Sequence, residues 1–320
     1  MTYLKVLVTG ASGFVGKALV FHLLGDKRFT PVAAMRDSAR LRAPCSVVEY
    51  DLDAPTELPG LTDIHVVVHA AARVHVINEK SVDALGEFRR VNVLGTLNLA
   101  RRAAESGVKR FIFISSIKVN GESTPPGKPF TADDIPAPVD PYSVSKHEAE
   151  EGLRRLADET GMEVVIIRPP LIYGPGVKAN FLSMLRWLDR GFPLPLGAIR
   201  NQRSLVAIEN FLDLITVCIT CPAAANQTFL VSDGEDLSTT QLLHYLADAL
   251  NSKCRILPVP QEVLRFALRV LGQEKIAQRL CGSLQVDISH TRERLGWTPP
   301  VDMKTAILQT VHHYQNERSP

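Results

Sequence analysis

Two features of the sequence predict an α/β fold, a doubly wound parallel sheet with a smaller C-terminal lobe. Short apolar runs such as VVV, FIFI and VVII alternate with helical segments through the first half of the chain. Strands of this kind are typical of parallel sheets that helices cover on both faces. From Pro169 onward, repeated prolines break the chain into short elements, which indicates the second, smaller unit.

The strands are predicted at the short apolar runs, and the helices lie in the longer segments between them. One helix has a suitable N-cap in Asp140 and a suitable first residue in Pro141. The proline-rich stretch 125–141 is expected to form a surface loop. In chain order we expect strand 5–9, helix 14–24, strands 30–35, 46–49 and 64–69, helix 88–106, strand 110–115, the helix from 141, and strand 164–167.

Length and composition are those of an ordinary globular protein, with 320 residues, 45% hydrophobic and 22% charged. A formal charge of +2 without a basic stripe excludes nucleic acid as an expected partner. No stretch reaches the roughly 18 apolar residues needed to span a bilayer. The chain enters its first strand without a signal-like region, so we expect no membrane insertion and a cytoplasmic location.

The five cysteines are odd in number and scattered, which argues against a disulfide framework and agrees with a reducing compartment. Cys218 and Cys221 form a C-x-x-C pair without a second pair or a histidine cluster. Burial as small apolar side chains is therefore favoured over a metal or redox site. We expect no metal.

A strand, a glycine turn and a helix start follow one another at the N-terminus. The glycines are spaced G-x-x-G-x-x-G, and the order suits a pyrophosphate resting on the helix N-terminus. This motif predicts a Rossmann-type dinucleotide-binding domain. The predicted contacts in the turn are Gly10, Ser12, Gly13, Phe14, Val15 and Gly16.

Arg36 stands about 20 residues past the last glycine, where an arginine suits the 2′-phosphate of NADP and an acid suits NAD. Because Asp37 follows, NADP(H) is favoured and NAD(H) is possible; a solvated loop of mixed charge is the alternative. Ligands of open α/β sheets collect at the carboxyl ends of strands. Further contacts are therefore expected at Asp51, Leu52, His69, Ala70 and Ala71.

Tyr142 and Lys146 are spaced Y-x-x-x-K, which places the phenol and the ammonium on one face of a helix. A neighbouring positive charge favours the phenolate and is expected to lower the pKa of Tyr142 toward neutrality, together with a bound nicotinamide. Any tyrosine and lysine on a helix would match this spacing. Tyr142 lies at a predicted helix start, however, and the chain also contains a glycine turn typical of dinucleotide binding. This combination indicates hydride chemistry.

Seven segments in the same order make the chain resemble the extended short-chain dehydrogenases/reductases, in the branch that modifies nucleotide sugars. They are TGASGFVG, HAAA, VNVLGTLNL, FISS, PYSVSK, IRPPLIYGPG and DISHTRERLGWTPP. The resemblance implies that residues 1–170 form the dinucleotide-binding domain, to which 206–232 return. It implies a substrate lobe of residues 171–205 and 233–320.

The resemblance also implies roles for single residues. Tyr142 would be the acid/base, Lys146 would hold the nicotinamide ribose and tune Tyr142, and Ser116 would hydrogen-bond the reacting sugar oxygen. Ser115 is adjacent and expected to be structural, although a one-residue shift would exchange the two serines. Asn92 and Pro169 complete the implied cofactor contacts.

A UDP-sugar is the substrate that the resemblance implies. Asn180, Leu182 and Arg203 match positions near the nucleotide diphosphate, and the planar fork of Arg203 suits that group. The alternative for Arg203 is a position on a solvated loop without a contact to the diphosphate. The alternative for Phe192, which could stack near a uracil, is a position in the core. The implied substrate contacts are Arg73, Lys118, Asn180, Leu182, Phe192 and Arg203.

Where many sugar epimerases have V-Y-G after the serine, this chain has Val119, Asn120 and Gly121. The segment IKVNGE, with Arg73 and His75 in AARVHV, is similar to bacterial reductases of UDP-4-keto-6-deoxy-N-acetylglucosamine in surface-polysaccharide synthesis. This similarity favours a 4-ketoreductase.

The alternative is a UDP-glucose or UDP-N-acetylglucosamine 4-epimerase with tightly bound NAD. A dehydratase is third, since Ile117 and Lys118 provide no acidic pair, and a cofactor-sensing binding protein is a remote fourth. The resemblance also implies a homodimer through the helices that contain Asn92 and Tyr142.

Overall fold

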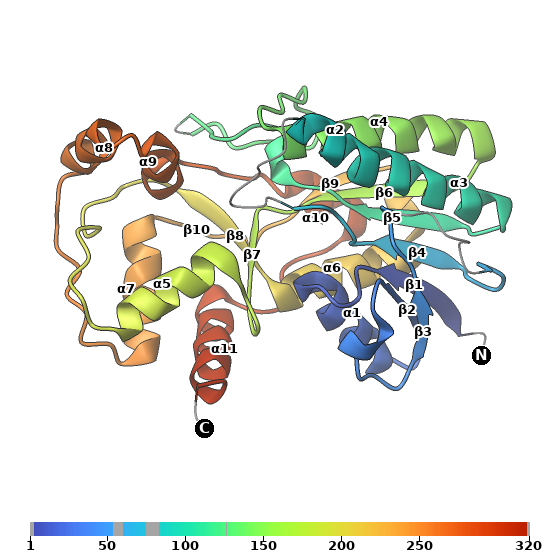
Figure 1. Cartoon of the computed structure of the whole chain (residues 1–320), viewed down its shortest axis with the longest axis horizontal. Coiled ribbons are helices and arrows are strands. Elements are labelled where there is room, and N and C mark those ends of the chain that lie inside the picture. Colours follow the sequence, from blue (N-terminus) through green and yellow to red (C-terminus); the bar gives the residue numbers. More distant parts are fainter. Residues whose placement is uncertain (1–2, 54–59, 75–82, 126, 319–320) are drawn as a thin grey trace.

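A seven-stranded sheet lies at the centre of the larger part of the protein (Figure 1). The computed structural model describes residues 3–53, 60–74, 83–125 and 127–318. All neighbouring strands in the sheet pair in parallel, which confirms the predicted fold class. The order is β3 (Ser46–Glu49), β2 (Phe29–Met35), β1 (Leu4–Thr9), β4 (Val66–His69), β5 (Arg110–Ile114), β6 (Glu163–Arg168) and β9 (Thr228–Leu230).

Helices cover both faces of this sheet (Figure 1). The side chains of each strand alternate between the two faces. Val6 and Val8 of β1 pack on one side, whereas Leu7 between them packs on the other. Burial on both faces explains why the strands are apolar throughout. One face carries α1 (Phe14–Leu24) and α6 (Ile208–Thr220); the other carries α2 (Ala84–Phe88), α3 (Thr96–Glu105) and α4 (Pro141–Thr160).

The helix predicted over 88–106 is divided by a π-helical turn, Arg89–Gly95, between α2 and α3. Gly95 fits this turn because a Cβ there would lie 2.7 Å from the Leu52 carbonyl oxygen. The wider turn carries Asn92 with its side chain buried. Apolar spacing alone does not distinguish one extra residue per turn, so the sequence did not predict this interruption.

A second sheet of three strands, β10-β8-β7, lies beside the first and belongs to the smaller lobe (Figure 1). Its core includes Phe181, Leu185, Leu243 and Ile307. The elements are β7 (Leu171–Tyr173), β8 (Arg203–Ala207), β10 (Asp236–Leu237), α5 (Ala179–Asp189), α7 (Thr239–Leu250), α8 (Gln261–Val270), α9 (Glu274–Cys281) and α11 (Met303–Asn316), while α10 (Ser289–Leu295) packs near β9.

The chain returns to the main sheet after β8: α6 packs against α1, and β9 pairs with β6. Arg110 fixes this return, because its Nη1 donates to the carbonyl oxygens of Cys218 and Cys221 at the end of α6. A cation at a helix C-terminus is stabilising. Cys218 is buried, and all five cysteines are free thiols. Within the described ranges, no helix combines the length and apolarity required to cross a membrane.

Candidate active site

The glycine turn connects the carboxyl end of β1 to the N-terminus of α1. A Cβ at Gly10 would lie 2.8 Å from the Ala71 backbone nitrogen, and one at Gly16 would lie 2.2 Å from the Gly10 carbonyl oxygen. Only glycine fits this close packing. Gly13 is the N-cap of α1, and no side chain caps the helix. The backbone N–H groups at this end therefore fit the pyrophosphate of a dinucleotide. Ser12, Phe14 and Val15 lie in this same turn and first helical residues.

His69, at the end of the neighbouring strand β4, is fully buried and belongs to the core. Hydrogen bonds join its Nδ1 to Thr9 Oγ1 at 2.8 Å and its Nε2 to Thr96 Oγ1 at 3.0 Å. Burial lowers the pKa of His69 to about 3. The enclosed ring has both nitrogens in use within the protein, and the predicted cofactor contact at His69 stays a prediction. Ala70 and Ala71 follow it and are partly exposed beside Gly10.

Arg36 is exposed directly after β2. Asp37 is instead used locally: its side chain accepts from the Ala39 nitrogen and pairs with Arg40 at 3.1 Å. Arg36 makes no hydrogen bond or ion pair with other described residues. Of the two charges at this strand end, the guanidinium is therefore the one available to a ligand.

Asp51 and Leu52 lie beyond β3. The Asp51 carboxylate accepts from the Asp53 nitrogen at 3.0 Å, and Leu52 is buried with its carbonyl against Gly95. Asp51 is partly exposed, so its carboxylate is the more accessible of the two side chains.

Helix α4 begins as the sequence predicted. The Asp140 side chain accepts from the Ser143 nitrogen at 2.7 Å, the Ser143 hydroxyl caps Asp140 in return, and Pro141 is the first helical residue. This capping box fixes where the helix starts. Tyr142 is consequently held in the first turn of α4, with its ring edge against Phe88 at 6.1 Å between centroids.

Lys146 lies one turn further along the same face and is 1% exposed. Its Nζ lies 3.8 Å from the centroid of Phe113 on β5, a favourable cation–π contact. Burial lowers the pKa of Lys146 to about 7, and the nearby charge of Glu150 opposes this shift.

The expected lowering of the Tyr142 pKa does not come from the residues of the chain. Burial raises the pKa of Tyr142 to about 12, and the negative charge of Asp140 adds to the rise. Desolvation of the phenolate outweighs the attraction to Lys146 that the sequence suggested.

The two serines after β5 have different environments. Ser115 is buried and donates to the Glu150 carboxylate. Ser116 is partly exposed, and its hydroxyl oxygen accepts from the Lys118 nitrogen at 3.2 Å as N-cap of the short 3₁₀ helix Ile117–Val119. This arrangement agrees with the prediction that Ser116 is the serine available to a ligand.

Asn92 is a structural link, and its side chain is fully engaged. Its Nδ2 donates to the Arg73 carbonyl at 3.1 Å and to Ser145 Oγ at 3.0 Å, while its Oδ1 accepts from the Arg73 nitrogen. Ser145 in turn donates to the Tyr142 carbonyl at 2.7 Å. This amide therefore ties residue 73 to α4, and the predicted cofactor contact at Asn92 stays a prediction. Arg73 is partly exposed, with its guanidinium 5.7 Å from the Phe88 ring.

Lys118 and Pro169 are also held by the protein. Lys118 Nζ pairs with Asp140 at 2.5 Å and Glu122 at 3.1 Å, so a substrate would have to compete with two carboxylates for it. Pro169 is buried and its carbonyl accepts from the Ile117 nitrogen. These contacts give Lys118 and Pro169 clear structural roles at the entrance of α4 and beside Ser116.

The predicted substrate residues of the lobe are spread over three elements. Arg203, on β8, donates through Nη1 to the carbonyls of Arg279 and Gly282 at the end of α9. Asn180 is exposed and Leu182 is half-buried on α5, and Phe192 is 58% exposed, so Phe192 is not a core residue. His75 lies outside the described residues.

Sequence reasoning missed a buried polar cluster around Glu150, Arg168 and Asn120. The spacing of Glu150 from Lys146 on α4 could have suggested it. Its partner Arg168 is on another element, so the pair itself is a tertiary contact.

The glycine turn, residues 70–71, Ser116 and the start of α4 all lie at the carboxyl edge of the adjacent strands β1, β4 and β5.

Comparison with known proteins identifies the family of the chain. The model of the NAD dependent epimerase/dehydratase family matches residues 6–231. A UDP-glucose 4-epimerase of Vibrio cholerae is 49% identical over 313 residues, covering 97% of this chain and 95% of the relative.

Two solved structures share the fold. The UDP-glucose 4-epimerase of Thermotoga maritima, solved with UDP-glucose, has a TM-score of 0.79 at 21% identity and covers 99% of this chain and 100% of its own. RMD from Pseudomonas aeruginosa, complexed with NADPH, has a TM-score of 0.73 at 24% identity and covers 98% and 99%. The chain belongs to the NAD dependent epimerase/dehydratase family and is an NAD(P)-dependent enzyme of the extended short-chain dehydrogenase/reductase type.

Proposed function

We propose that the protein is a UDP-hexose 4-epimerase that keeps its nicotinamide cofactor bound through the reaction. The observation that carries this proposal is the 49% identity to a UDP-glucose 4-epimerase along nearly the full length of both chains. It favours the epimerase, the alternative from the sequence, over the 4-ketoreductase that the sequence placed first.

The proposed chemistry divides among three side chains at the carboxyl edge of the sheet. Tyr142 takes the proton from the C4 hydroxyl and returns it after the sugar has turned over. Ser116 donates a hydrogen bond to the same oxygen as charge develops on it. Lys146 holds the nicotinamide ribose and contributes positive charge beside Tyr142. The bound nicotinamide supplies the hydride acceptor and donor.

Two features support this assignment. The capping box holds Tyr142 in the first turn of α4, and the ring of Phe113 holds the ammonium of Lys146. Because burial and the charge of Asp140 raise the pKa of Tyr142, the proton transfer that we propose depends on positive charge from Lys146 and from the oxidised nicotinamide.

We place the cofactor on the glycine turn and the UDP-sugar in the lobe. Gly10, Gly13 and Gly16 let the turn pack closely at the N-terminus of α1, whose first backbone N–H groups would receive the pyrophosphate, and Asp51, Ala70 and Ala71 lie along the same edge. Arg203, bound on one side to the end of α9, would present its remaining N–H groups to the diphosphate, and Phe192 would stack on the uracil. The predicted homodimer and cytoplasmic location stay part of this proposal.

A second candidate is the 4-ketoreductase, and two observations favour it. The guanidinium of Arg36 is exposed at the end of β2, which suits NADP(H), whereas a retained epimerase cofactor would be NAD(H). Asn120 replaces the aromatic residue of many epimerases and is buried in contact with Arg168.

One assay separates the two candidates. The purified protein is incubated with UDP-glucose, and then with UDP-N-acetylglucosamine, without added cofactor, and the products are followed by NMR. The epimerase predicts interconversion with the galacto isomers by nicotinamide already bound. Loss of NADPH absorbance with UDP-4-keto-6-deoxy-N-acetylglucosamine, without any interconversion, would contradict the epimerase and favour the reductase.

A further inference from the structure

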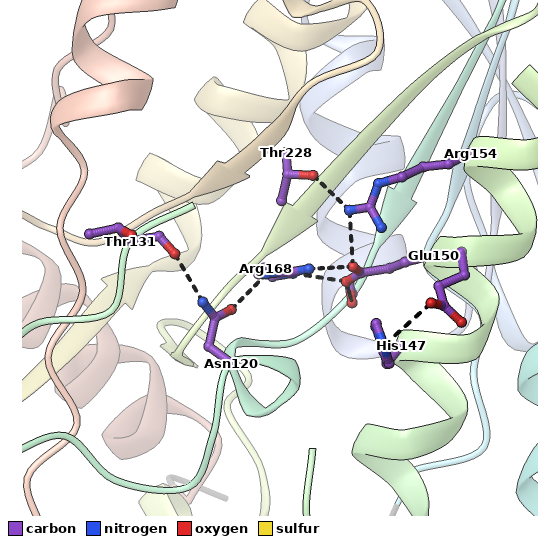
Figure 2. Close-up of polar contacts among 9 residues, drawn as sticks. Asn120, Thr131, His147, Glu150, Arg154, Arg168 and Thr228 are labelled. Atoms are coloured by element: carbon purple, nitrogen blue, oxygen red, sulfur yellow. Dashed lines mark hydrogen bonds and ion pairs between the residues drawn. The ribbon is translucent and has the colours of Figure 1, made fainter. Parts of the chain in front are cut away.

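Glu150 is a buried carboxylate one turn beyond Lys146 on α4. Its side chain is fully buried, and that of Arg168, at the end of β6, is 2% exposed. Arg168 Nε donates to Glu150 Oε1 at 3.0 Å, and Nη2 donates to Oε2 at 2.6 Å (Figure 2). A buried ion pair of this kind requires good geometry and further hydrogen bonds to offset its desolvation.

Two further donors complete the coordination of the carboxylate. Ser115 donates to Oε1. Arg154 Nη2 donates to Oε2 at 3.3 Å while also donating to Thr228 Oγ1 (Figure 2). Both oxygens of Glu150 therefore accept from two side chains each. A carboxylate satisfied in this way is rigidly placed.

The cluster continues from Arg168 to the loop before α4. Arg168 Nη1 donates to Asn120 Oδ1 at 2.9 Å, and Asn120 Nδ2 donates to the Thr131 carbonyl at 2.9 Å (Figure 2). Asn120 is the residue that departs from V-Y-G. Since Asn120 is 3% exposed, this departure alters the buried support of the site and not an open pocket wall.

Two of the segments joined through Glu150 also carry residues with a proposed part in the reaction. Ser115 precedes Ser116, and Asn120 ends the short helix that Ser116 caps. Glu150 itself lies on the helix of Tyr142 and Lys146. One carboxylate thus connects the segments that hold the phenol, the ammonium and the serine hydroxyl.

We propose that Glu150 is a positioning residue for the reaction, which fixes Ser116 and the Tyr142–Lys146 face of α4 relative to each other through Ser115, Arg168 and Asn120. The inference rests on the proposed function for the identity of the three reacting side chains. Apolar side chains of similar volume commonly stabilise a core as well as a buried ion pair does, so stability alone gives little reason for this cluster.

Glu150 also acts on the charge of Lys146. The titratable groups that interact with the ammonium are Glu150 on α4 and His69 on β4, and His69 is uncharged above its low pKa. Glu150 therefore raises the pKa of Lys146 against the effect of burial. If the ammonium is required, activity declines as pH rises through this pKa, and removal of Glu150 moves the decline to lower pH.

The test is Glu150→Gln, which keeps the shape of the side chain, with Glu151→Gln as matched control. Glu151 is the next residue, is 51% exposed and faces His147 at 3.7 Å. We expect Glu150→Gln to lower kcat about tenfold or more with KM changed less than about twofold, and to shift the alkaline decline in activity to lower pH. Glu151→Gln should match the wild type in all three measurements.

Glu150→Gln leaves Arg168 without its partner, so it could reduce the yield of folded protein. Glu150→Gln combined with Arg168→Met removes both charges and serves as the second variant. Wild-type kcat and pH profile in either folded variant would overturn the proposal. All variants are compared on a substrate that the wild type converts. An inactive wild type on UDP-hexoses would count against the epimerase, whereas variants equal to the wild type would count against Glu150.

Discussion

The carboxyl edge of the main sheet and the surface of the smaller lobe are built on different principles. At the sheet edge, His69, Lys146 and Glu150 are buried and held by side chains from several elements. In the lobe, Phe192 is largely exposed, and α8 carries Phe266 with 71% of its surface exposed. The protein buries and fixes the groups around the proposed proton-transfer residue Tyr142, and it leaves exposed Phe192, the aromatic residue proposed to stack on the uracil.

This contrast separates the expected consequences of substitution. Changes at the sheet edge should alter kcat or the pH dependence of stability, because they disturb buried charges. Changes in the lobe should alter KM alone, since exposed side chains adjust at little cost.

Tyr142→Phe should have the largest effect. Removing the phenolic oxygen eliminates the proposed proton transfer, which is worth roughly 10²–10⁴-fold in turnover. Cofactor binding, measured by fluorescence of the reduced nicotinamide, should change little. Tyr245→Phe, on α7 in the lobe, is the control. Wild-type turnover by Tyr142→Phe would refute the role of the phenol.

Lys146→Met should abolish activity while stabilising the fold at neutral pH. The folded-state pKa of about 7 lies below the ordinary value of 10.5, so the unfolded chain binds the extra proton between these values. The wild-type free energy of unfolding therefore carries no penalty from Lys146 above pH 10.5. It decreases by a few kcal/mol as pH falls from 10.5 toward 7. The free energy of unfolding of Lys146→Met, measured in urea, should exceed that of the wild type by roughly 2–4 kcal/mol at pH 7 and by less at pH 10. Exposed Lys109→Met should show neither effect, and an equal gain at both pH values would contradict the buried charge.

His69→Gln should reduce the decrease in the free energy of unfolding that occurs at acid pH. The pKa of His69 is lowered from 6.5 to about 3, so the unfolded chain binds a proton in this range that the folded protein excludes. Wild-type stability should consequently fall by about 2 kcal/mol between pH 6.5 and pH 5 from this residue, and the variant should lose that part. Unchanged pH dependence in the variant would show that the ring is not buried uncharged. Exposed His312→Gln is the control.

Arg36 is an exposed charge at the sheet edge, so Arg36→Ala tests a case between the buried groups of the sheet edge and the exposed surface of the lobe. If Arg36 binds a 2′-phosphate, affinity for NADPH should fall about tenfold while affinity for NADH changes little, as measured by calorimetry. Arg40→Ala removes a neighbouring arginine that is already paired with Asp37. Equal losses for both nucleotides would exclude a role for Arg36 in selecting the cofactor.

Phe192→Ala should have the smallest effect. Loss of one stacked face in an exposed setting should raise KM for the UDP-sugar about threefold to fivefold without changing kcat. Trp187→Ala, another exposed aromatic residue on the lobe, should leave both constants unchanged. A fall in kcat would show that the lobe is more tightly coupled to the chemistry than the contrast suggests.

The sequence predicted those features that depend on local signals. Apolar runs identified β1, β4, β5 and β6 and their parallel pairing, and Asp140 with Pro141 identified the start of α4. Local signals do not reveal the features that burial or distant partners decide. The ring of His69 lies in the core, the pKa of Tyr142 is raised, and Lys118 is held by Asp140, which is 22 residues away.

The π-helical turn has a consequence for insertions and deletions. Asn92 lies within the turn and Thr96 directly after it, and their side chains reach Ser145 and His69 respectively. Deleting the exposed Leu94 would restore regular α-helical winding but rotate one contact relative to the other by about 100°. Both partners could not then be reached at once. The length of this short segment should therefore be constrained more strictly than the identity of its outward-facing residues.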